Sequence, residues 1–401
     1  YGNQEVIATA TEQMNKLTFS HMFGGKTHQV AIDLADKLAD MIPMKDAVIS
    51  FGNSGSDAND THIKLLRYYH EAIGKPHCRK IIARERSYHG VTVAAASLTG
   101  LPVTQNHFDL PVDALGILRT DHPHYYRGKQ GEETEDEFVD RIVSNLESMI
   151  LREGPDTIAA FIAEPITGAS GVIVPPQGYY QKVQAVLNRY DIMFWADEVI
   201  TGFGRTGSDF GCNTMGIESP DMMTFAKQLS SAYMPISASA INRDMYTAMI
   251  EQTATAGAFG HGYTYSGHPV ACAVALKVLE IYQRDEIFQK AAVTGQYMQK
   301  RLAEFSDHPL VGEVRGSGLL GAIELVADKK TGQPFVGGAV GGYAQKMAQD
   351  SGLLIRAVAG SSLGFCPPLI ITEPQIDELI GKVSIALDKT LEHCHKHSLI
   401  V

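Results

Sequence analysis

Short runs of apolar, often β-branched residues alternate along this chain with longer segments of helical periodicity. The apolar runs are continuous rather than alternating, and they lie at 46–51, 80–84, 157–165, 192–199, 222–227 and 236–241. Continuous hydrophobicity is typical of strands that are buried on both faces of a sheet. Between them, the segment 134–152 has apolar residues on one helical face, and Thr134 and Glu137 match a capping box. This strand–helix alternation predicts an α/β fold with a mostly parallel sheet.

The pattern changes after the helical run that follows Pro269. From about residue 285, helices mix with short strands such as GLLGAIELV and GLLIRAV. The 401 residues also exceed a single domain of about 150 residues. We therefore expect an N-terminal segment at 1–25, a large α/β domain at 26–284 and a smaller α+β domain at 285–401. Because the chain begins with Tyr1 rather than Met, we also expect that residues upstream of it are missing.

Composition excludes several classes of protein. There are 34 basic and 45 acidic residues, and a formal charge of −11 argues against a general nucleic-acid binder because such a surface repels phosphate backbones. No apolar run approaches the roughly 18 residues that a membrane-spanning helix needs. The five cysteines are scattered and form no CxxC pair, which disfavours a disulfide framework or a zinc module. With no signal-peptide pattern at the start, we expect a cytoplasmic protein.

Two histidine-rich stretches have the residue types of a metal site. They are DHPHYY, with His122 and His124, and HCHKH, with His393 and His397. The second pair is four residues apart on an expected helix, a spacing that some metal sites use. No acidic partner or second cluster completes either stretch in the sequence. We therefore expect no metal site, and we interpret HCHKH as a solvated helix end.

Two glycine-rich segments have the composition of phosphate-binding loops. FGNSGSDAND, at 51–60, follows an expected strand and precedes a helix. Gly55 lets a ligand approach closely, and Ser56 with the first helical amides can hold a phosphate dianion, although such residues also simply cap helices. TGFGRTG, at 201–207, contains a GxGxxG pattern, but turn-rich residues follow it, so we expect no dinucleotide site there.

An acid and a lysine stand at the ends of two consecutive expected strands. Asp197 and Glu198 end the run at 192–199, and Lys227 ends the next run. Ligands of open α/β sheets bind at such ends, although a lysine there is often only a surface residue. With the loop at 51–60, these are the parts that a pyridoxal 5'-phosphate (PLP) enzyme needs: an amine, an anion for the ring nitrogen and donors for the phosphate.

At this point the sequence resembles the class III aminotransferases, which are PLP enzymes of fold type I. Seven motifs carry the resemblance in collinear order over nearly the whole chain: NSGSDAND, SYHG, AEPITGASG, WADEVITGFGRTG, FAKQLSSAY, GYTYSGHP, and GLLIR before PPL. NSGSDANDT, KIIARERSYHG and TYSGHP look most like the branch that transfers amino groups from amines or ω-amino acids to pyruvate. The resemblance implies a ping-pong aminotransferase that works through a Schiff base on Lys227.

The resemblance also implies roles around the cofactor ring. Lys227 corresponds to the lysine that forms the Schiff base, and Asp197 to the acid that contacts the ring nitrogen. Val199 corresponds to the residue that packs under the ring. Tyr88 corresponds to the aromatic residue on the opposite ring face, with His89 beside it. Lys227 and Asp197 are therefore the expected catalytic residues.

Further cofactor contacts are implied at some distance from the ring nitrogen. Gly55 and Ser56 correspond to the phosphate loop, and Glu164 to a carboxylate near the 3-oxygen of the ring. Thr264 corresponds to a threonine that reaches the phosphate bound by the neighbouring subunit. The resemblance thus implies a homodimer with shared active sites.

Substrate contacts are expected from Arg356, Tyr88 and Tyr263. Arg356 corresponds to a mobile arginine that binds a substrate carboxylate and swings out for uncharged groups, and an arginine fork suits a keto acid. Ornithine- and γ-aminobutyrate-type relatives have a glutamate that holds this arginine, whereas this chain has Ala169. That difference argues against diamino and γ-amino substrates.

The chain departs from the family pattern after the lysine as well. Members commonly have glycine in this region, whereas Gln228, Ala232 and Ser237 stand here. Three alternatives to an aminotransferase stay open at this level: a PLP-dependent aminomutase, racemase or decarboxylase, a non-catalytic relative, and a nicotinamide-dependent dehydrogenase. The intact Lys227 and Asp197 argue against the second.

Overall fold

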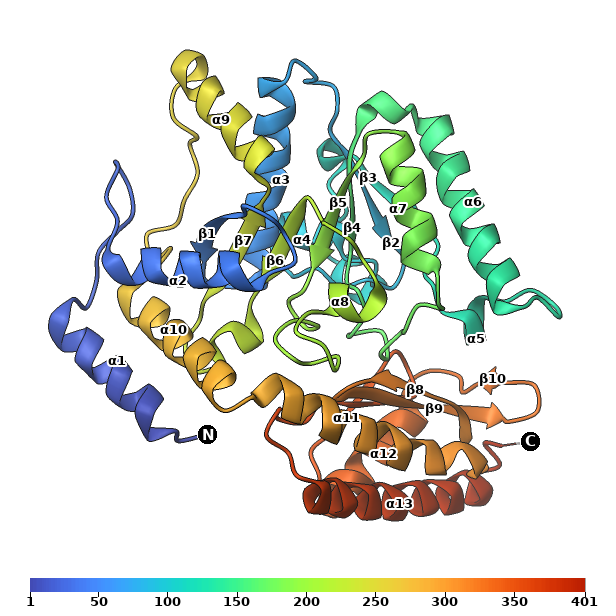
Figure 1. The fold of residues 1–401 in the computed structure, drawn as a ribbon. Helices are drawn as coiled ribbons and strands as arrows, with labels where there is room; N and C mark the ends of the chain where they lie inside the picture. Colours follow the sequence, from blue (N-terminus) through green and yellow to red (C-terminus); the bar gives the residue numbers. More distant parts are fainter. Residues whose placement is uncertain (401) are drawn as a thin grey trace.

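A seven-stranded sheet organises residues 48–241 of the computed structural model, which describes residues 1–400 (Figure 1). Its order is β1-β7-β6-β5-β4-β2-β3, and the strands β3, β2, β4, β5 and β6 are mutually parallel, whereas β7 is antiparallel to β6 and β1. The strands are β1 (Val48–Gly52), β2 (Lys80–Arg84), β3 (Ile117–Thr120), β4 (Ile158–Ala163), β5 (Met193–Asp197), β6 (Met222–Phe225) and β7 (Ser237–Ile241).

The predicted α/β fold with a mostly parallel sheet is confirmed. Each of the six expected strands is present, but β3 was not predicted from the sequence. Its four residues, ILRT, form no apolar run, because β3 lies at the edge of the sheet, pairs only with β2 and is only partly buried over three of its positions. Edge strands that are short and polar give little hydrophobic signal.

Both faces of the sheet are buried along its inner strands β4, β5, β6 and β7, which explains the continuous apolar runs there. All six residues of β4 are buried. Phe161 and Ala163 belong to one hydrophobic core, whereas Ala160 and Ile162 belong to a second core on the opposite face. Because side chains alternate along a strand, a strand between two cores must be apolar at every position.

Helices cover the sheet and continue beyond it. They are α1 (Gln4–Lys16), α2 (Gln29–Met41), α3 (Gly55–Ala72), α4 (Val93–Leu98), α5 (Tyr125–Gly128), α6 (Glu135–Glu153), α7 (Tyr179–Arg189), α8 (Gly211–Met215), α9 (Arg243–Ala256), α10 (Pro269–Arg284), α11 (Ile287–Ala303), α12 (Ala339–Asp350) and α13 (Glu373–Lys396). The capping box predicted at the start of α6 is confirmed: Thr134 and Glu137 bond each other's backbone N–H groups.

A second sheet of five strands lies in the C-terminal part of the chain, together with α11, α12 and α13 (orange to red in Figure 1). Its strands are β8 (Val311–Ser317), β9 (Leu320–Asp328), β10 (Gln333–Pro334), β11 (Arg356–Val358) and β12 (Ser362–Phe365), with β8, β10 and β12 paired to β9 and β11 to β12. Between α10 and α11, Glu286 has a φ of +52° and turns the chain. The division at residue 285 stays a prediction.

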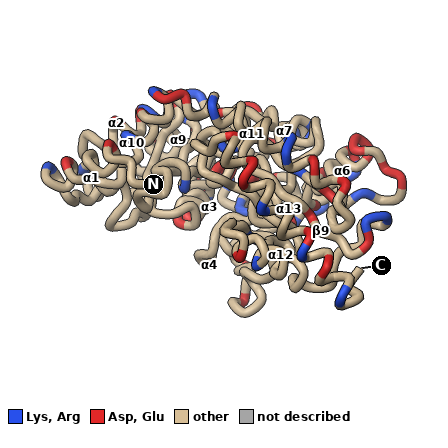
Figure 2. The backbone as a smooth tube through the Cα atoms, turned by 90° about the horizontal axis from the view of Figure 1, so that it is seen from below, with Lys and Arg blue, Asp and Glu red and all other residues tan. Residues whose placement is uncertain are grey.

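Charged residues of both signs are distributed over the whole chain (Figure 2). Among residues 1–400, no helix combines the length and the apolar character that crossing a membrane requires.

Candidate active site

A cavity of about 850 Å³ lies at the carboxyl ends of β4, β5 and β6 and extends to β11 and β12 of the second sheet. Parallel strands direct their carboxyl ends to one edge, which is where α/β proteins bind ligands. Residues far apart in sequence meet there. The expected site residues that line the cavity are Gly55, Ser56, Tyr88, His89, Glu164, Asp197, Val199, Lys227 and Arg356.

The N-terminal end of α3 forms one wall of the cavity. Ser54 is the N-cap and completes a capping box with Asp57, whose carboxylate accepts from the backbone N–H groups of Asn53 and Ser54. The helix therefore begins at Gly55 within the motif, and its first amides are available to an anion. The Ser56 hydroxyl accepts from Val91 N at 3.1 Å, which leaves its own hydrogen to donate. These donors fit a phosphate group.

Close contact between α3 and the loop after β5 defines the neighbouring wall. A Cβ atom placed on Gly55 would lie 3.0 and 3.2 Å from the two methyl groups of Val199. Only glycine allows this approach without displacing Val199, which itself lines the cavity.

Asp197 is buried at the end of β5 with an incomplete set of donors. Its Oδ2 accepts from His89 Nδ1 at 2.8 Å and from Asn59 Nδ2 at 3.1 Å, and its Oδ1 accepts from Val199 N at 3.1 Å. Burial by itself would raise the pKa of Asp197, but these hydrogen bonds, with His89 foremost, hold it below its usual value. A carboxylate has about four acceptor positions, so Oδ1 has one left for a ring N–H.

Lys227 follows β6 after one residue and begins the 3-10 helix η4 (Lys227–Ser230). The expected strand thus ends at Phe225, two residues earlier than predicted. Lys227 has a φ of +43°, a left-handed conformation that is uncommon for lysine, and its side chain is exposed in the cavity. Its Nζ makes no hydrogen bond to any residue between 1 and 400, which leaves the amine available to a ligand.

Glu164 holds the segment that carries Tyr88. The Glu164 Oε1 accepts from Tyr88 N at 2.9 Å, and Oε2 accepts from Gly168 N at 3.0 Å. Burial raises the pKa of Glu164. Arg84, fully buried at the end of β2, donates from Nη2 to the Glu164 carbonyl at 2.6 Å and from Nη1 to the Tyr180 hydroxyl at 2.9 Å. Arg84 was not predicted as a supporting residue.

Two expected residues do not join this cavity within one chain. Thr264 is exposed, and Tyr263 lines a separate cavity of about 540 Å³. The Tyr263 hydroxyl donates to the Asp57 carbonyl in the first turn of α3, at 3.3 Å. Arg356, at the start of β11, is exposed at the cavity and makes no hydrogen bond within residues 1–400.

The residues that depart from the family pattern lie in or near the cavity. Ala169 lines the cavity, as does Ala232, which has a φ of +62°. Such a left-handed conformation favours glycine, which explains why glycine would be common there. The Ser237 hydroxyl donates to Asp57 Oδ1 at 3.0 Å and so supports the start of α3, while the carbonyl of Gln228 accepts from the Tyr282 hydroxyl at 3.0 Å.

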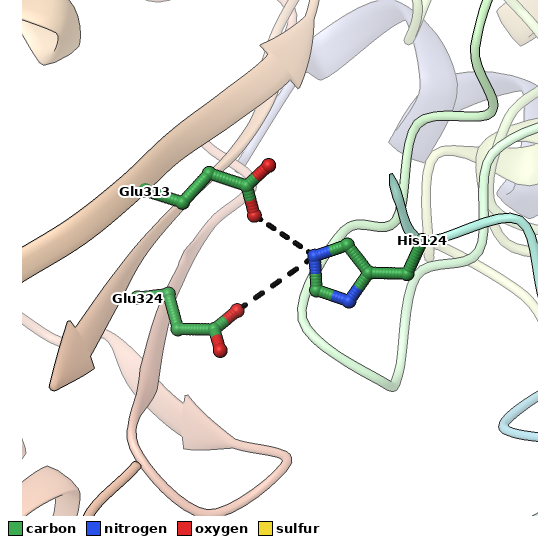
Figure 3. Close-up of side chains that lie close together, drawn as sticks. All are labelled: His124, Glu313 and Glu324. Atoms are coloured by element: carbon green, nitrogen blue, oxygen red, sulfur yellow. Dashed lines mark hydrogen bonds and ion pairs between the residues drawn. The ribbon is translucent and has the colours of Figure 1, made fainter. Parts of the chain in front are cut away.

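One of the two histidines of DHPHYY, His124, has carboxylate neighbours that the sequence did not reveal. His124 Nε2 lies 2.8 Å from Glu313 Oε2 and 3.9 Å from Glu324 Oε2 (Figure 3). The expectation that no acidic partner completes this stretch was therefore wrong, because both partners come from the second sheet. Arg315 already pairs with both carboxylates at 2.5 Å and Arg127 with Glu324 at 2.6 Å, so the site's negative charge is neutralised by guanidinium groups. The cluster links the loop after β3 to β8 and β9.

Comparisons with known proteins agree with this geometry. The family model described as aminotransferase class-III matches residues 1–387. The chain belongs to the class III aminotransferases. It is 46% identical over 398 residues to a protein of Oryza sativa subsp. indica named probable gamma-aminobutyrate transaminase 3, mitochondrial, with 98% of this chain and 76% of that protein covered. It is 44% identical over 387 residues to the vanillin aminotransferase of Capsicum chinense, with 96% and 83% covered.

Solved structures show the same relationship. The omega transaminase of Pseudomonas jessenii in complex with PMP superposes with a TM-score of 0.95 at 48% identity, covering 98% of this chain and 86% of that one. This class III aminotransferase therefore has the fold type I architecture and uses PLP, as the resemblance implied. Its substrates are a small-molecule amine and a keto acid. Membership of this family removes the nicotinamide-dependent alternative.

Proposed function

We propose that this aminotransferase moves amino groups from an amine or ω-amino acid to pyruvate, with Lys227 and Asp197 as its catalytic residues. One observation supports the proposal most strongly: four features meet in one cavity. They are the unpaired Lys227 amine, the buried Asp197 carboxylate, the amino end of α3 and the exposed Arg356.

Each residue has a task that follows from its surroundings. When bound, PLP supplies an electron sink for the carbon that loses a proton. Asp197 Oδ1, with its remaining acceptor position, holds the proton on the ring nitrogen. Ser56 and the first amides of α3 bind the phosphate. Lys227 Nζ, which makes no hydrogen bond within residues 1–400, would be the base that accepts a proton from the donor carbon and the acid that gives it back.

Tyr88, His89, Val199 and Glu164 form the remaining contacts of the proposed cofactor site. Val199 and Tyr88 supply the two packing faces, because both line the cavity beside Asp197. His89 acts through its hydrogen bond to Asp197. Glu164 keeps Tyr88 in place through the Tyr88 N–H.

The substrate side of the cavity combines apolar walls with one cation. Leu320, Leu354, Ile355 and Phe365 line it together with Arg356. Apolar walls favour an uncharged donor substituent, and the arginine fork binds the carboxylate of the acceptor bidentately. Ala169 gives Arg356 no carboxylate partner. Since several relatives are named gamma-aminobutyrate transaminases, that ω-amino acid belongs in the donor panel despite Ala169.

We also propose a homodimer in which Thr264 reaches the phosphate site of the partner subunit and Tyr263 contacts substrate there. Thr264 is exposed and lies beside an apolar cavity lined by Phe23, Tyr246 and Tyr263, which is the character of a surface that a second copy would cover. Sedimentation of the holoenzyme at two concentrations tests this, with a monomer of 43.6 kDa as the contrary result. The cytoplasmic location stays a prediction, and some relatives are named mitochondrial or chloroplastic.

The proposed reaction is tested by visible absorption of the protein with added PLP. We expect a yellow imine band that disappears with a carboxylate-free amine and returns with pyruvate, and that is absent from Lys227→Ala. A band that no amine removes, with product formed from a single substrate, would instead indicate an aminomutase, racemase or decarboxylase. A band that returns only with 2-oxoglutarate would contradict pyruvate as acceptor.

A further inference from the structure

Behind Asp197 lies a chain of buried hydrogen bonds that runs away from the cavity. Trp195 Nε1 donates to the Thr224 hydroxyl at 2.9 Å, and Thr224 Oγ1 donates to Asn59 Oδ1 at 2.8 Å. The Asn59 amide then donates to Asp197 Oδ2 at 3.1 Å and to the His89 carbonyl at 2.6 Å. Trp195, Thr224 and Asn59 are all fully buried.

The direction of this chain is set by its first member. An indole N–H only donates, so the Thr224 hydroxyl must accept from it and has its own hydrogen free for Asn59. Asn59 therefore presents its oxygen to Thr224 and its two amide hydrogens to Asp197 and His89. Every side-chain donor hydrogen along the chain is used, and a buried network of this kind is rigid because any reversal leaves a polar group unpaired.

We infer that Thr224 and Asn59 are positioning residues for the reaction. Through a chain of hydrogen bonds whose direction is set by the Trp195 indole, they keep the Asp197 carboxylate unprotonated and oriented towards the cavity. Reversal of the Asn59 amide would place its oxygen against the Asp197 carboxylate, and the Thr224 hydroxyl prevents this. The inference rests on the proposed role of Asp197. It assigns a function to buried side chains that touch neither cofactor nor substrate themselves.

The register of the sheet brings the members of this hydrogen-bond chain together. Thr224 on β6 pairs with Asp197 on β5, and Trp195 lies two residues before Asp197 on the same face. Asn59 is on the buried face of α3, four residues after Gly55. The same helix thus supplies the proposed phosphate cradle at its first turn and the support for Asp197 at its second. The titratable groups that face Asp197 are His89, Glu164 and His62, with Lys227 across the cavity.

The test compares Thr224→Val, which removes the hydroxyl at nearly constant shape, with Thr224→Ser, which keeps it. Ser239→Ala is the matched control: Ser239 pairs with Thr224 from the neighbouring strand β7, and its buried hydroxyl donates to Ala58 O of α3 at 3.3 Å but makes no hydrogen bond to Trp195, Thr224, Asn59 or Asp197. Three quantities are measured: the PLP dissociation constant, the pH midpoint of the bound-cofactor absorption change, and the NMR signal of the indole N–H, which is unique because the chain has one tryptophan.

We expect Thr224→Val to bind PLP about tenfold more weakly and to move the absorption midpoint by roughly one pH unit, as loss of one hydrogen bond to a charged network predicts. The indole signal should move upfield even without cofactor. Thr224→Ser and Ser239→Ala should resemble the wild type in all three. Asn59→Asp, which cannot donate to Asp197, should weaken PLP binding by about 100-fold.

Three results would overturn the inference alone: a Thr224→Val protein with wild-type midpoint and affinity, a weaker affinity without any movement of the midpoint, or equal changes in Ser239→Ala. The second would show that the hydroxyl merely supports the fold. If the wild-type protein with added PLP shows no yellow imine band, the proposed function fails, and this inference fails with it.

Discussion

The contact between Gly55 and Val199 gives a quantitative prediction about cofactor binding. In Gly55→Ala, the new methyl group would lie 3.0 and 3.2 Å from the Val199 methyls, whereas carbon atoms are in favourable contact at about 3.5–4.0 Å. Val199 must therefore retreat by about 0.5 Å. Forcing an extra methyl into a packed site costs about 1–3 kcal/mol, while alanine in a helix is up to about 1 kcal/mol better than glycine.

These two effects act on different quantities. For the apoprotein they partly offset, so its free energy of unfolding in urea should fall by no more than about 2 kcal/mol. For the holoenzyme, Val199 is displaced from the wall against which the ring is proposed to pack. We expect a PLP dissociation constant about tenfold higher, which corresponds to about 1.4 kcal/mol. Titrating apoprotein with PLP while following the fluorescence of Trp195, the only tryptophan, measures it.

A double-mutant cycle makes the reasoning refutable. Val199→Ala removes the methyl groups that the new side chain would meet, so Gly55→Ala should weaken PLP binding by less than about threefold in that background. Gly381→Ala is the control: Gly381 is an exposed residue of α13 with no atom within 4 Å of an added Cβ, so the variant should gain up to about 1 kcal/mol of stability without any change in PLP affinity. Unchanged PLP affinity in Gly55→Ala, or an equal loss in both backgrounds, would refute the steric account.

Three other predictions concern charge, backbone conformation and a thiol. Because burial raises the pKa of Glu164, the folded apoprotein keeps a proton on this carboxyl above pH 4.5, where the unfolded chain releases it. The stability of the apoprotein should therefore fall as the pH rises from 4.5 towards the raised pKa. Urea unfolding measured across this pH range should show a flatter profile for Glu164→Gln. Ala232→Gly should raise the free energy of unfolding by up to about 1 kcal/mol, and with it the urea midpoint, since the φ of residue 232 is +62°. A lower midpoint would contradict this. Cys366 is exposed in the cavity whereas the other four cysteines are buried, so a thiol reagent should label one cysteine in the native protein and block amine binding, and Cys366→Ala should abolish the labelling.

The cluster around His124 is formed by residues that are distant in the sequence, and local pattern does not relate them. The sequence of DHPHYY predicted no acidic partner for its histidines, yet Glu313 and Glu324, nearly 200 residues away in the second sheet, lie beside His124. Nothing in the local pattern of residues 121–126 indicates which strand will face it. The same holds for Asn59: a polar residue on the apolar face of a helix signals a buried role, but the sequence does not name its partner.

The sequence by itself determined what depends on local pattern. Continuous apolar runs indicated the strands of a mostly parallel sheet, Thr134 and Glu137 specified the start of α6, and the order of motifs specified the family, because each of these signals is contained in a few neighbouring residues. Tertiary structure alone decided which donor faces which oxygen. The pairing of β5 with β6 places Thr224 opposite Asp197 and within hydrogen-bond distance of the Trp195 indole, and the arrangement of the strands brings Lys227 to the same cavity. Such contacts depend on strand order and register, which bring together residues that no local periodicity relates.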